Sequence, residues 1–279
     1  MSVRVASLLP ASTEWLCELG IEPVAVSHEC DFPEASVRGK PRVTSSRVDS
    51  KASPAEIDRQ VRELRDAGED LYALDEKLLA ELAPDVIVTQ AQCDVCAVSE
   101  DAVRALAEKL PGRPKVVAMS GSTLAGIKKD VLAIGEAGGR AEEARTRVHI
   151  FEASLELIRC GPPPRRKRFV HLEWTDPPML AASWIPELAV IAGLDILRAD
   201  LAGKKSVAAT WEEIRAFEPE LVVVAPCGFD LKRARVESEQ VAERLPAARV
   251  VPADGNALFN RPGPRLLESV LMLSLESSR

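Results

Sequence analysis

Two segments, one in each half of the chain, carry the same pattern of a helix, a proline–acid turn and an apolar strand. They are LLAELAPDVIVTQ at residues 78–90 and EIRAFEPELVVVA at residues 213–225, so Pro84 corresponds to Pro219. Both halves also begin with a strand, a polar loop and a tryptophan-bearing helix that ends at glycine, in RVASLLPASTEWLCELG and FVHLEWTDPPMLAASWIPELAVIAG. This matched order of elements predicts two similar lobes instead of one continuous sheet.

Strand and helix signals alternate in both halves, which predicts α/β architecture: two Rossmann-like lobes with mainly parallel sheets. We expect strands at residues 3–9, 23–26, 86–89, 115–119, 169–172, 221–225 and 249–252. We expect helices at residues 11–19, 53–67, 75–82, 100–110, 185–192, 210–217 and 264–274.

Residues 123–158 have no strand signal, and their apolar residues recur at helical spacing. Gly138 and Gly139 predict a break between two helices there. We therefore divide the chain into an N-terminal α/β lobe at residues 1–122, a helical linker at residues 123–164 and a C-terminal α/β lobe at residues 165–279.

Charge and hydropathy exclude several classes of function. The 279 residues carry a net charge of −7 with acidic and basic residues interspersed, which argues against binding to nucleic acid or to a membrane surface. There is no run of eighteen apolar residues, and the start, MSVRVASLLPAS, lacks the charged and apolar regions of a signal peptide. We therefore expect a cytoplasmic protein without membrane insertion, whose six cysteines are free thiols or metal ligands.

Polar and aromatic side chains gather in the loops that follow the predicted strands. Because parallel α/β lobes bind ligands at the carboxyl ends of their strands, we expect these loops to line one ligand cleft between the lobes. The ligand-binding residues predicted in the first lobe are His28, Glu29, Cys30, Gln90, Gln92, Cys93 and Cys96. Those predicted in the second lobe are Glu173, Trp174, Cys227, Phe229, Phe259 and Arg261.

The chemistry of these loops suggests a metal or a metal-bearing ligand. Thiol, imidazole and carboxylate groups that converge can bind a soft or borderline metal, and the predicted metal ligands are Cys93, Cys96, His28 and Cys227. A single Cys-x-x-Cys is only half of a zinc motif, so ligand contact and inert packing both stay open for this pair. The chain contains no GxSxG, GxxxxGK[ST] or HExxH, and we predict that it is not an enzyme.

Segments along nearly the whole chain resemble the class III periplasmic substrate-binding proteins of the iron-siderophore and vitamin B12 type. They are RVASLLPASTEWLCELGIEPVAVSHECDFP, LLAELAPDVIVTQ, TWEEIRAFEPELVVVAP and NRPGPRLLESV. The patterns HECD, QCDVCAVS, EWTDP, APCGFD and NRPGPRL resemble a cobalamin-binding subgroup that lacks a signal peptide.

This resemblance implies two α/β lobes joined by one long backbone helix, a corrinoid ligand and, if the protein is exported, an ABC permease as partner. In the exported B12 binders, aromatic residues in the early loops hold the corrin. The corresponding positions here lie near Glu29, Ser45 and Gln90, and none of them is aromatic.

The sequence thus predicts a monomeric, non-enzymatic binding protein for a cobalamin-like corrinoid or another small metal-bearing molecule. In this interpretation Trp174 and Phe259 are apolar walls of the cleft, and the Cys-x-x-Cys forms part of its floor. Three alternatives stay open: a zinc- or iron-binding protein without an organic ligand, a thiol-dependent enzyme with Cys93 or Cys96 as nucleophile, and a transport component that has lost its ligand.

Overall fold

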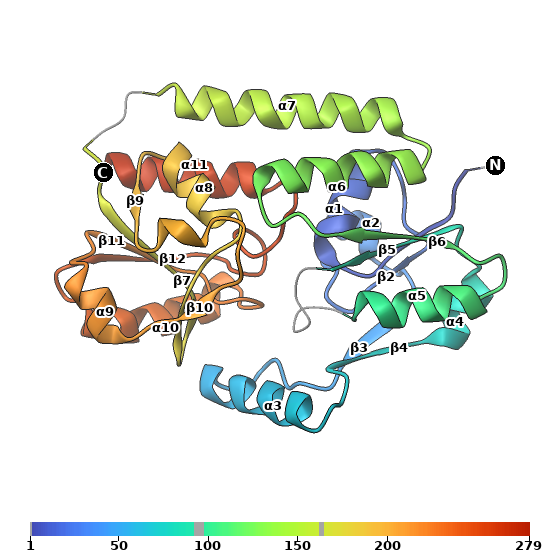
Figure 1. The fold of residues 1–279 in the computed structure, drawn as a ribbon, viewed down its shortest axis with the longest axis horizontal. Helices are drawn as coiled ribbons and strands as arrows, with labels where there is room; N and C mark the ends of the chain where they lie inside the picture. The colour runs from blue at the N-terminus through green and yellow to red at the C-terminus, as the bar shows by residue number, and fades with distance from the viewer. Residues whose placement is uncertain (1, 92–97, 162–164) are drawn as a thin grey trace. The chain divides into compact units, whose positions relative to one another are not determined.

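The chain divides into two compact units (Figure 1). The computed structural model describes residues 2–91, 98–161 and 165–279. Unit 1 comprises Met1–Gly121 and Ala125–Ile150, and unit 2 comprises Ser122–Leu124 and Phe151–Arg279. The long helix α7 (Ala141–Arg159) therefore carries residues of both units. The predicted lobe and linker boundaries, and the predicted cleft between the lobes, stay predictions.

Unit 1 is built on a parallel four-stranded sheet in the order β2-β1-β5-β6. Its strands are β1 (Val5–Ser7), β2 (Ala25–Val26), β5 (Val86–Gln90) and β6 (Lys115–Met119). Its helices are α1 (Pro10–Glu18), α2 (Glu34–Val37), α4 (Glu76–Leu82), α5 (Glu100–Lys109) and most of α6 (Leu124–Ala137). The central strand β5 is buried along Val86, Ile87 and Val88, as expected for a parallel strand covered on both faces.

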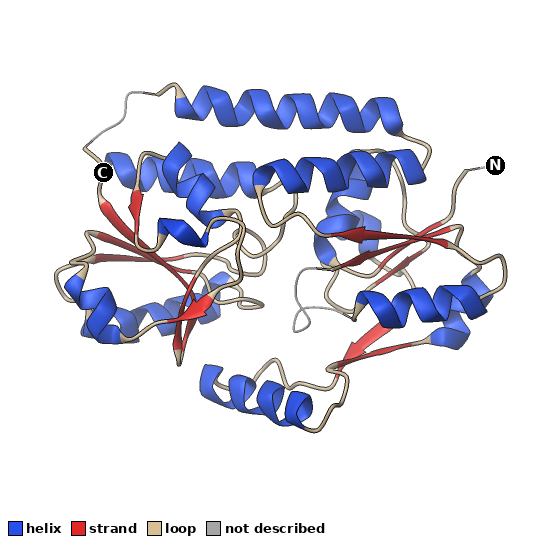
Figure 2. Cartoon of the chain, viewed as in Figure 1, coloured by secondary structure: helices blue, strands red, loops and turns tan. Residues whose placement is uncertain are grey.

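A hairpin carries one further helix of unit 1 (Figures 1 and 2). Strands β3 (Thr44–Ser46) and β4 (Tyr72–Leu74) pair with each other antiparallel and form a sheet of their own. Helix α3 (Pro54–Asp66) lies between them in the chain. The sequence predicts this helix but not the hairpin, because strands of three residues are too short to show a period.

Unit 2 contains a six-stranded sheet in the order β10-β8-β7-β11-β12, with β9 also paired to β7. Its strands are β7 (Arg168–Thr175), β8 (Pro178–Leu180), β9 (Asp195–Ile196), β10 (Val207–Ala208), β11 (Leu221–Val224) and β12 (Arg249–Pro252). Its helices are α8 (Ile185–Ile191), the short 3-10 helix η1 (Ala199–Leu201), α9 (Trp211–Ala216), α10 (Leu231–Arg244) and α11 (Leu266–Ser278). Strands β7, β11 and β12 are parallel, whereas β8 runs antiparallel to β7.

The internal repeat predicted from the sequence is visible in the strand order. Strands β1-β5-β6 of unit 1 and β7-β11-β12 of unit 2 are matched sets of adjacent parallel strands. The residues before the two corresponding prolines, Ala83 and Glu218, both adopt positive φ, at 40° and 49°. The predicted α/β class with mainly parallel sheets is confirmed. Along the described chain, no helix is both long and apolar enough to cross a membrane.

Helix α10 is absent from the sequence prediction. Its buried face includes Glu237 and Ser238 beside Ala234 and Val241, so its polar residues do not mark an exposed side. The Glu237 carboxylate accepts a hydrogen bond of 2.6 Å from the Thr175 hydroxyl at the end of β7. A helix face that is buried through polar contacts leaves no apolar period to detect.

We predict that Gly255→Ala destabilises unit 2. A Cβ at residue 255 would lie 2.1 Å from the Pro226 carbonyl oxygen, and a backbone oxygen cannot relieve this clash by a change of rotamer. We expect the free energy of unfolding to fall by about 1–3 kcal/mol in urea titrations. Gly161→Ala is the control, because its φ is not positive and the nearest atom to a new Cβ lies 3.3 Å away. Wild-type stability of Gly255→Ala would contradict this close approach of the two loops.

Candidate functional site

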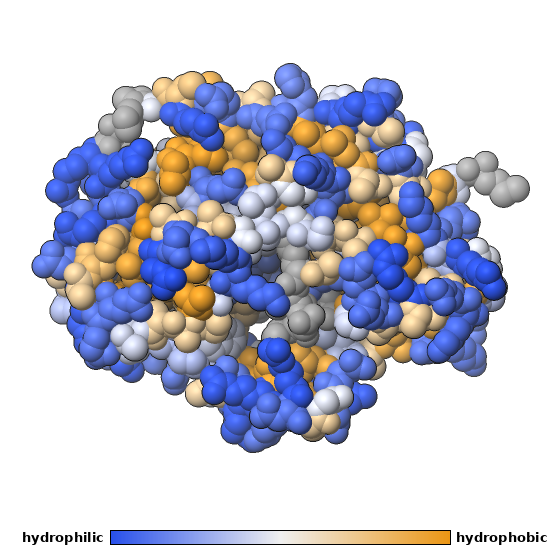
Figure 3. All heavy atoms as spheres, viewed as in Figure 1, coloured by the Kyte–Doolittle hydropathy of each residue, from blue (hydrophilic) through white to orange (hydrophobic). Residues whose placement is uncertain are grey.

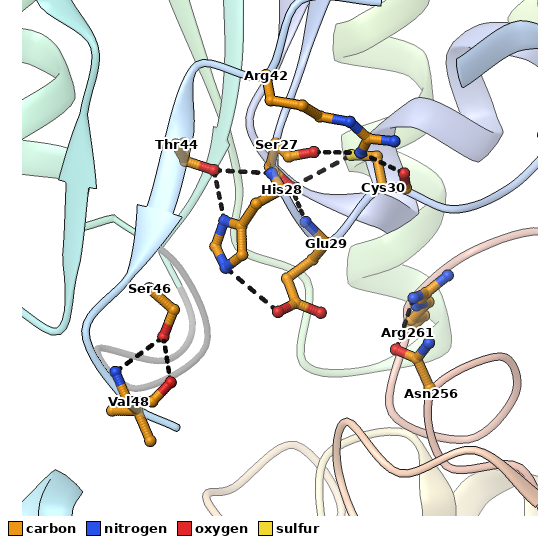
Figure 4. A network of polar contacts seen from close by, with 10 residues as sticks. All are labelled: Ser27, His28, Glu29, Cys30, Arg42, Thr44, Ser46, Val48, Asn256 and Arg261. Carbon is orange, nitrogen blue, oxygen red and sulfur yellow. Dashed lines mark hydrogen bonds and ion pairs between the residues drawn. The ribbon is translucent and has the colours of Figure 1, made fainter. Parts of the chain in front are cut away.

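The loop after β2 in unit 1 presents the imidazole of His28 (Figure 4). His28 follows the carboxyl end of the strand by two residues, and its side chain is 24% exposed. The Thr44 hydroxyl, from the first residue of β3, accepts a hydrogen bond of 3.0 Å from the His28 backbone N–H. The same hydroxyl lies 2.7 Å from His28 Nδ1, so one threonine fixes both the backbone and the ring.

This arrangement leaves the second ring nitrogen of His28 without a hydrogen bond. Nε2 is buried and has no hydrogen-bond partner, although Glu29 Oε1 lies 3.2 Å away. Thr44 accepts from both groups of His28 when Nδ1 carries the ring proton, whereas a proton on Nε2 would point to Glu29 Oε1 (Figure 4). A neutral imidazole oriented through its other nitrogen is the usual form of a histidine metal ligand.

Arg42 and Ser27 hold the rest of this loop. The Arg42 guanidinium donates to the carbonyl oxygens of Ser27, at 2.7 Å, and Cys30. The Ser27 hydroxyl accepts from the Glu29 backbone N–H at 3.2 Å. Figure 4 shows these contacts converging on the Ser27–Cys30 turn, which therefore has a fixed backbone.

Cys30 does not present its thiol to solvent. It is 1% exposed, and Sγ lies 3.1 Å from the Thr13 hydroxyl and 3.3 Å from that of Ser27. Burial raises the pKa of the thiol above its ordinary value, so Cys30 stays neutral. Cys30 packs beside Val26 and Val37, and its predicted ligand contact stays a prediction.

A small cavity adjoins His28. It is lined by Leu8, Pro10, Ser27, His28, Glu29, Thr44, Tyr72 and Val98. The Tyr72 ring lies 5.6 Å from the imidazole, centroid to centroid. The predicted ligands Gln92, Cys93 and Cys96 lie outside the described residues, between Ala91 and Val98. Gln90 is the half-buried last residue of β5.

The aromatic residues predicted for the second lobe pack mainly against each other. Trp174 is 8% exposed and Phe229 2% exposed, with ring centroids 5.3 Å apart in an edge-to-face arrangement. The Arg233 guanidinium covers the Phe229 ring at 3.5 Å, and the Trp174 indole N–H donates to the Asp176 carbonyl oxygen at 3.1 Å. Trp174 and Arg233 cover the Phe229 ring, and its predicted ligand contact stays a prediction.

Phe259 is fully buried, and its predicted role as an apolar wall of the cleft stays a prediction. Its ring lies 4.7 Å from the ring of His171 on β7. Both ring nitrogens of His171 are buried and have no hydrogen-bond partner. Burial lowers the pKa of His171 to about 3, so this imidazole is neutral in the folded protein at neutral pH. The aromatic residue in the loop after β12 therefore serves the core of unit 2.

The remaining predicted residues of unit 2 differ in exposure. Cys227, after β11, is exposed, and its backbone N–H donates to the Glu173 carbonyl oxygen at 3.0 Å. Glu173 is half-buried near the end of β7. Arg261 is buried, and its guanidinium donates to Asn256 Oδ1 at 2.6 Å (Figure 4). Cys227 therefore has an exposed thiol, as has Cys160 after α7.

Thr44, Tyr72 and Arg42 are site residues that the sequence analysis missed. Thr44 lies sixteen residues after His28 and reaches it through the unpredicted hairpin. The segment RVTSSR after a proline resembles an ordinary polar loop, and only the pairing of β3 with β4 gives it a place in the site.

Among the described residues, no group of three or more His, Cys, Asp and Glu side chains is placed to hold a metal ion. His28 belongs to unit 1 and Cys227 to unit 2, and each is described within its own unit. The predicted four-residue metal set therefore stays a prediction, with two of its members outside the described chain. What the site shows is one preorganised imidazole.

Solved structures share this fold over the full length of the chain. No protein-family model matches the sequence, and a search of curated proteins found no relative. The chain is similar to a possible iron-binding, periplasmic solute-binding protein from Staphylococcus epidermidis ATCC 12228, with 19% identity, a TM-score of 0.73 and coverage of 100% and 99% of the two chains.

Two further structures carry named ligands. One is the periplasmic heme-binding protein RhuT from Roseiflexus sp. RS-1, with 16% identity, a TM-score of 0.71 and full coverage of both chains. The other is the periplasmic vitamin B12-binding protein BtuF of Vibrio cholerae, with 17% identity, a TM-score of 0.64 and coverage of 99% and 97%. The resemblance to class III periplasmic binding proteins is thus confirmed for the fold.

These comparisons correct the predicted cytoplasmic location. The similar structures are of periplasmic proteins, and this contradicts the cytoplasmic location expected from the sequence. The cysteines that the structure describes, Cys17, Cys30, Cys160 and Cys227, are free thiols.

We predict that His171 makes the protein acid-sensitive. Its pKa is lowered from 6.5 to about 3 by burial, so the unfolded chain binds this proton at a higher pH than the folded one. The stability is therefore complete above pH 6.5 and falls as the pH drops toward 3. At pH 4.5 the loss is about 2–3 kcal/mol.

Urea unfolding of wild type and His171→Leu between pH 7.5 and 4.5 measures this contribution. The Leu variant should lose less stability over this range by about the stated amount. His149→Leu, at an exposed position of α7, is the control and should follow the wild-type pH profile. Equal slopes for wild type and His171→Leu would show that His171 is not the titrating group.

Proposed function

We propose that this protein is a substrate-binding protein of an ABC transporter, and that its ligand is a metal-bearing macrocycle, either a heme or a corrinoid. The fold supports the first part, because it matches periplasmic proteins that bind heme and vitamin B12 over the whole chain. The observation that carries the second part is His28, whose Nε2 lacks a hydrogen bond while Nδ1 is held by Thr44.

Of the residues around His28, the imidazole is the group that would hold the metal of such a ligand, whereas the cavity they line is too small for the ring itself. A macrocycle bound there would supply a metal with an open axial position. The chain would supply the imidazole through Nε2, with Thr44 keeping the proton on Nδ1 and Arg42 holding the loop backbone. Tyr72 would contribute an aromatic face beside the ring. The protein thus binds and orients, and no bond of the ligand needs to be broken.

A zinc- or iron-binding protein without an organic ligand receives less support from the described residues. Glu29 Oε1 lies 3.2 Å from His28 Nε2, and the described residues contain no group of three or more side chains placed to hold a metal ion. One imidazole and one carboxylate are fewer ligands than a protein zinc site uses. A macrocycle brings most of its metal's ligands with it and needs only one more from the protein.

A thiol-dependent enzyme is also less favoured by the described cysteines. The pKa of Cys30 is raised by burial, and burial raises that of Cys17 as well. A nucleophilic cysteine needs the opposite shift. The solved structures with this fold are solute-binding proteins. An extracytoplasmic location and a membrane permease as partner belong to the same proposal.

We predict that His28→Ala weakens binding of both hemin and hydroxocobalamin. Wild-type protein titrated with either compound should show a saturable change in the visible spectrum near one equivalent for the true ligand. Loss of the axial imidazole should raise the Kd at least tenfold, which is about 1.4 kcal/mol. His149→Ala on α7 is the matched control and should bind like wild type.

The two compounds separate the possible ligands. Saturation with hemin alone identifies a heme protein, and saturation with hydroxocobalamin alone identifies a corrinoid protein. No spectral change with either, up to millimolar concentration, would reject the proposal. Binding that is equal in wild type and His28→Ala would keep the ligand and remove His28 from its site.

We predict that Thr44→Val weakens binding of the same ligand about tenfold without removing His28. Valine has the shape of threonine but cannot accept from the Nδ1 proton, so the imidazole loses its orientation. Thr44→Ser keeps the hydroxyl and should bind within about threefold of wild type. Titrations of both variants test this, with thermal unfolding to confirm that both are folded. Equal affinities for Val and Ser would contradict the positioning role.

A further inference from the structure

Helix α7 carries an apolar stripe on its solvent side. The four residues of the stripe repeat at intervals of four, three and four, and all of them are exposed: Thr146, Ile150, Ala153 and Leu157. Leu157 is 78% exposed and Ile150 is 46% exposed. This spacing places the four residues on one side of the helix. The opposite side holds the buried residues of α7, which are Ala144, Phe151 and Leu155.

A helix needs one apolar side to pack on its own chain, and α7 has two. Single exposed aliphatic residues are ordinary on a protein surface, whereas a row at this spacing is typical of a contact between helices. The one hydroxyl in the stripe already has an acceptor, because Thr146 donates to the Glu142 carbonyl oxygen at 3.0 Å. Figure 1 shows α7 as a single unbroken helix, and in Figure 3 apolar atoms reach the surface along it among charged ones. The stripe can therefore be covered without leaving a polar group unpaired.

The stripe is complementary to itself when its direction is reversed. Small and large side chains alternate along it, in the order Thr146, Ile150, Ala153 and Leu157. In an antiparallel pair of two copies, Ile150 lies opposite Ala153 and Leu157 lies opposite Thr146, so each large side chain meets a small one. A two-fold axis repeats both contacts. In a parallel pair each residue would meet its own copy, which sets leucine against leucine and leaves a gap at alanine.

The charges beside the stripe fit the same arrangement. With 3.6 residues per turn, Arg145 and Glu156 lie on the same flank of the stripe. A two-fold axis brings this flank against its own copy, so Arg145 lies opposite Glu156 of the second copy, and this pair occurs twice. Within the chain, Arg145 pairs with Glu142 and Glu156 with Arg159, and both ion pairs are exposed. Exposed pairs of this kind contribute little to stability, so these side chains can exchange partners.

We propose that α7 is the interface of a symmetric dimer, in which the stripes of two copies of the chain pack antiparallel. This differs from the monomer expected from the sequence, and it does not depend on the identity of the ligand. The 19 residues of α7 give a face about 28 Å long and about 10 Å wide. Such a face is smaller than the roughly 800 Å² per partner of a typical stable interface, so the dimer should dissociate on dilution.

Sedimentation equilibrium of the protein without ligand tests this dimer. The average mass of the wild type should rise from that of one chain toward that of two, between about 1 μM and about 1 mM. Ile150→Asp places a charge in the middle of the stripe and should raise the Kd of the dimer at least tenfold. Leu275→Asp is the matched control, because Leu275 on α11 is 64% exposed and lies outside the stripe. Its Kd should stay within twofold of wild type, and thermal unfolding should show both variants folded.

A charge exchange tests the antiparallel register. Arg145→Glu alone and Glu156→Arg alone should each raise the Kd at least threefold, because like charges then face each other at two symmetric positions. The double variant should return to within twofold of wild type, which a merely local effect on α7 would not produce. A double variant that dimerises no better than the single ones would contradict this register.

Three results would overturn the interface. One is a wild type that stays monomeric up to millimolar concentration. Another is a dimer that Ile150→Asp leaves intact. The third is a dimer that dissociates in Leu275→Asp and not in Ile150→Asp, which would place the contact on α11. None of these results bears on the proposed function, because no ligand takes part in the measurement.

Discussion

The parallel pairing of β1 with β2 and β5 is the constraint on which the candidate site depends. Ser7 at the end of β1 is in register with Val26 of β2 and Val88 of β5, so the loops after these strands leave the sheet at the same edge. The same holds in unit 2, where Val224 of β11 is in register with Leu172 of β7 and Pro252 of β12. These strands are buried, so polar side chains first reach solvent in the loops that follow them. The predicted site residues lie in or beside these loops.

One of these loops is much better fixed than a surface loop needs to be. Arg42 donates hydrogen bonds to the backbone of the Ser27–Cys30 turn, and the hydroxyls of Thr13 and Ser27 contact the Cys30 thiol. Those hydroxyls continue inward, since Thr13 donates to Ser7, which in turn lies 2.6 Å from the Ser12 hydroxyl. A buried polar network of this kind rigidifies what it supports. An imidazole that is already oriented costs little further conformational entropy when it binds, which is the usual reason for such preorganisation.

The sequence could predict whatever is local or repeated. The two helix–proline–strand segments, the break at Gly138 and Gly139 and the loop that carries His28 all depend on patterns within a few residues. The partner of His28 could not be found in this way, because Thr44 reaches it through a hairpin whose strands have three residues each. Burial was equally hidden: Phe259, Phe229 and Cys30 follow strands like true site residues, but their rings and thiol turn into the core. Whether the side chain of a loop residue is buried depends on how it packs against the rest of its unit. The sequence pattern does not show this packing.

The fate of these aromatic residues bears on the kind of ligand. In unit 1 the positions near Glu29, Ser45 and Gln90 have no aromatic ring, and in unit 2 Phe229 and Phe259 are used in the core. A ligand held by stacking alone would therefore find few platforms among the described residues predicted for the site. An imidazole with an available lone pair offers a different source of affinity, but only to a metal with an exchangeable axial position. Under the proposed function, this favours ferric heme or an aquo-corrinoid over a corrinoid whose two axial positions are already filled.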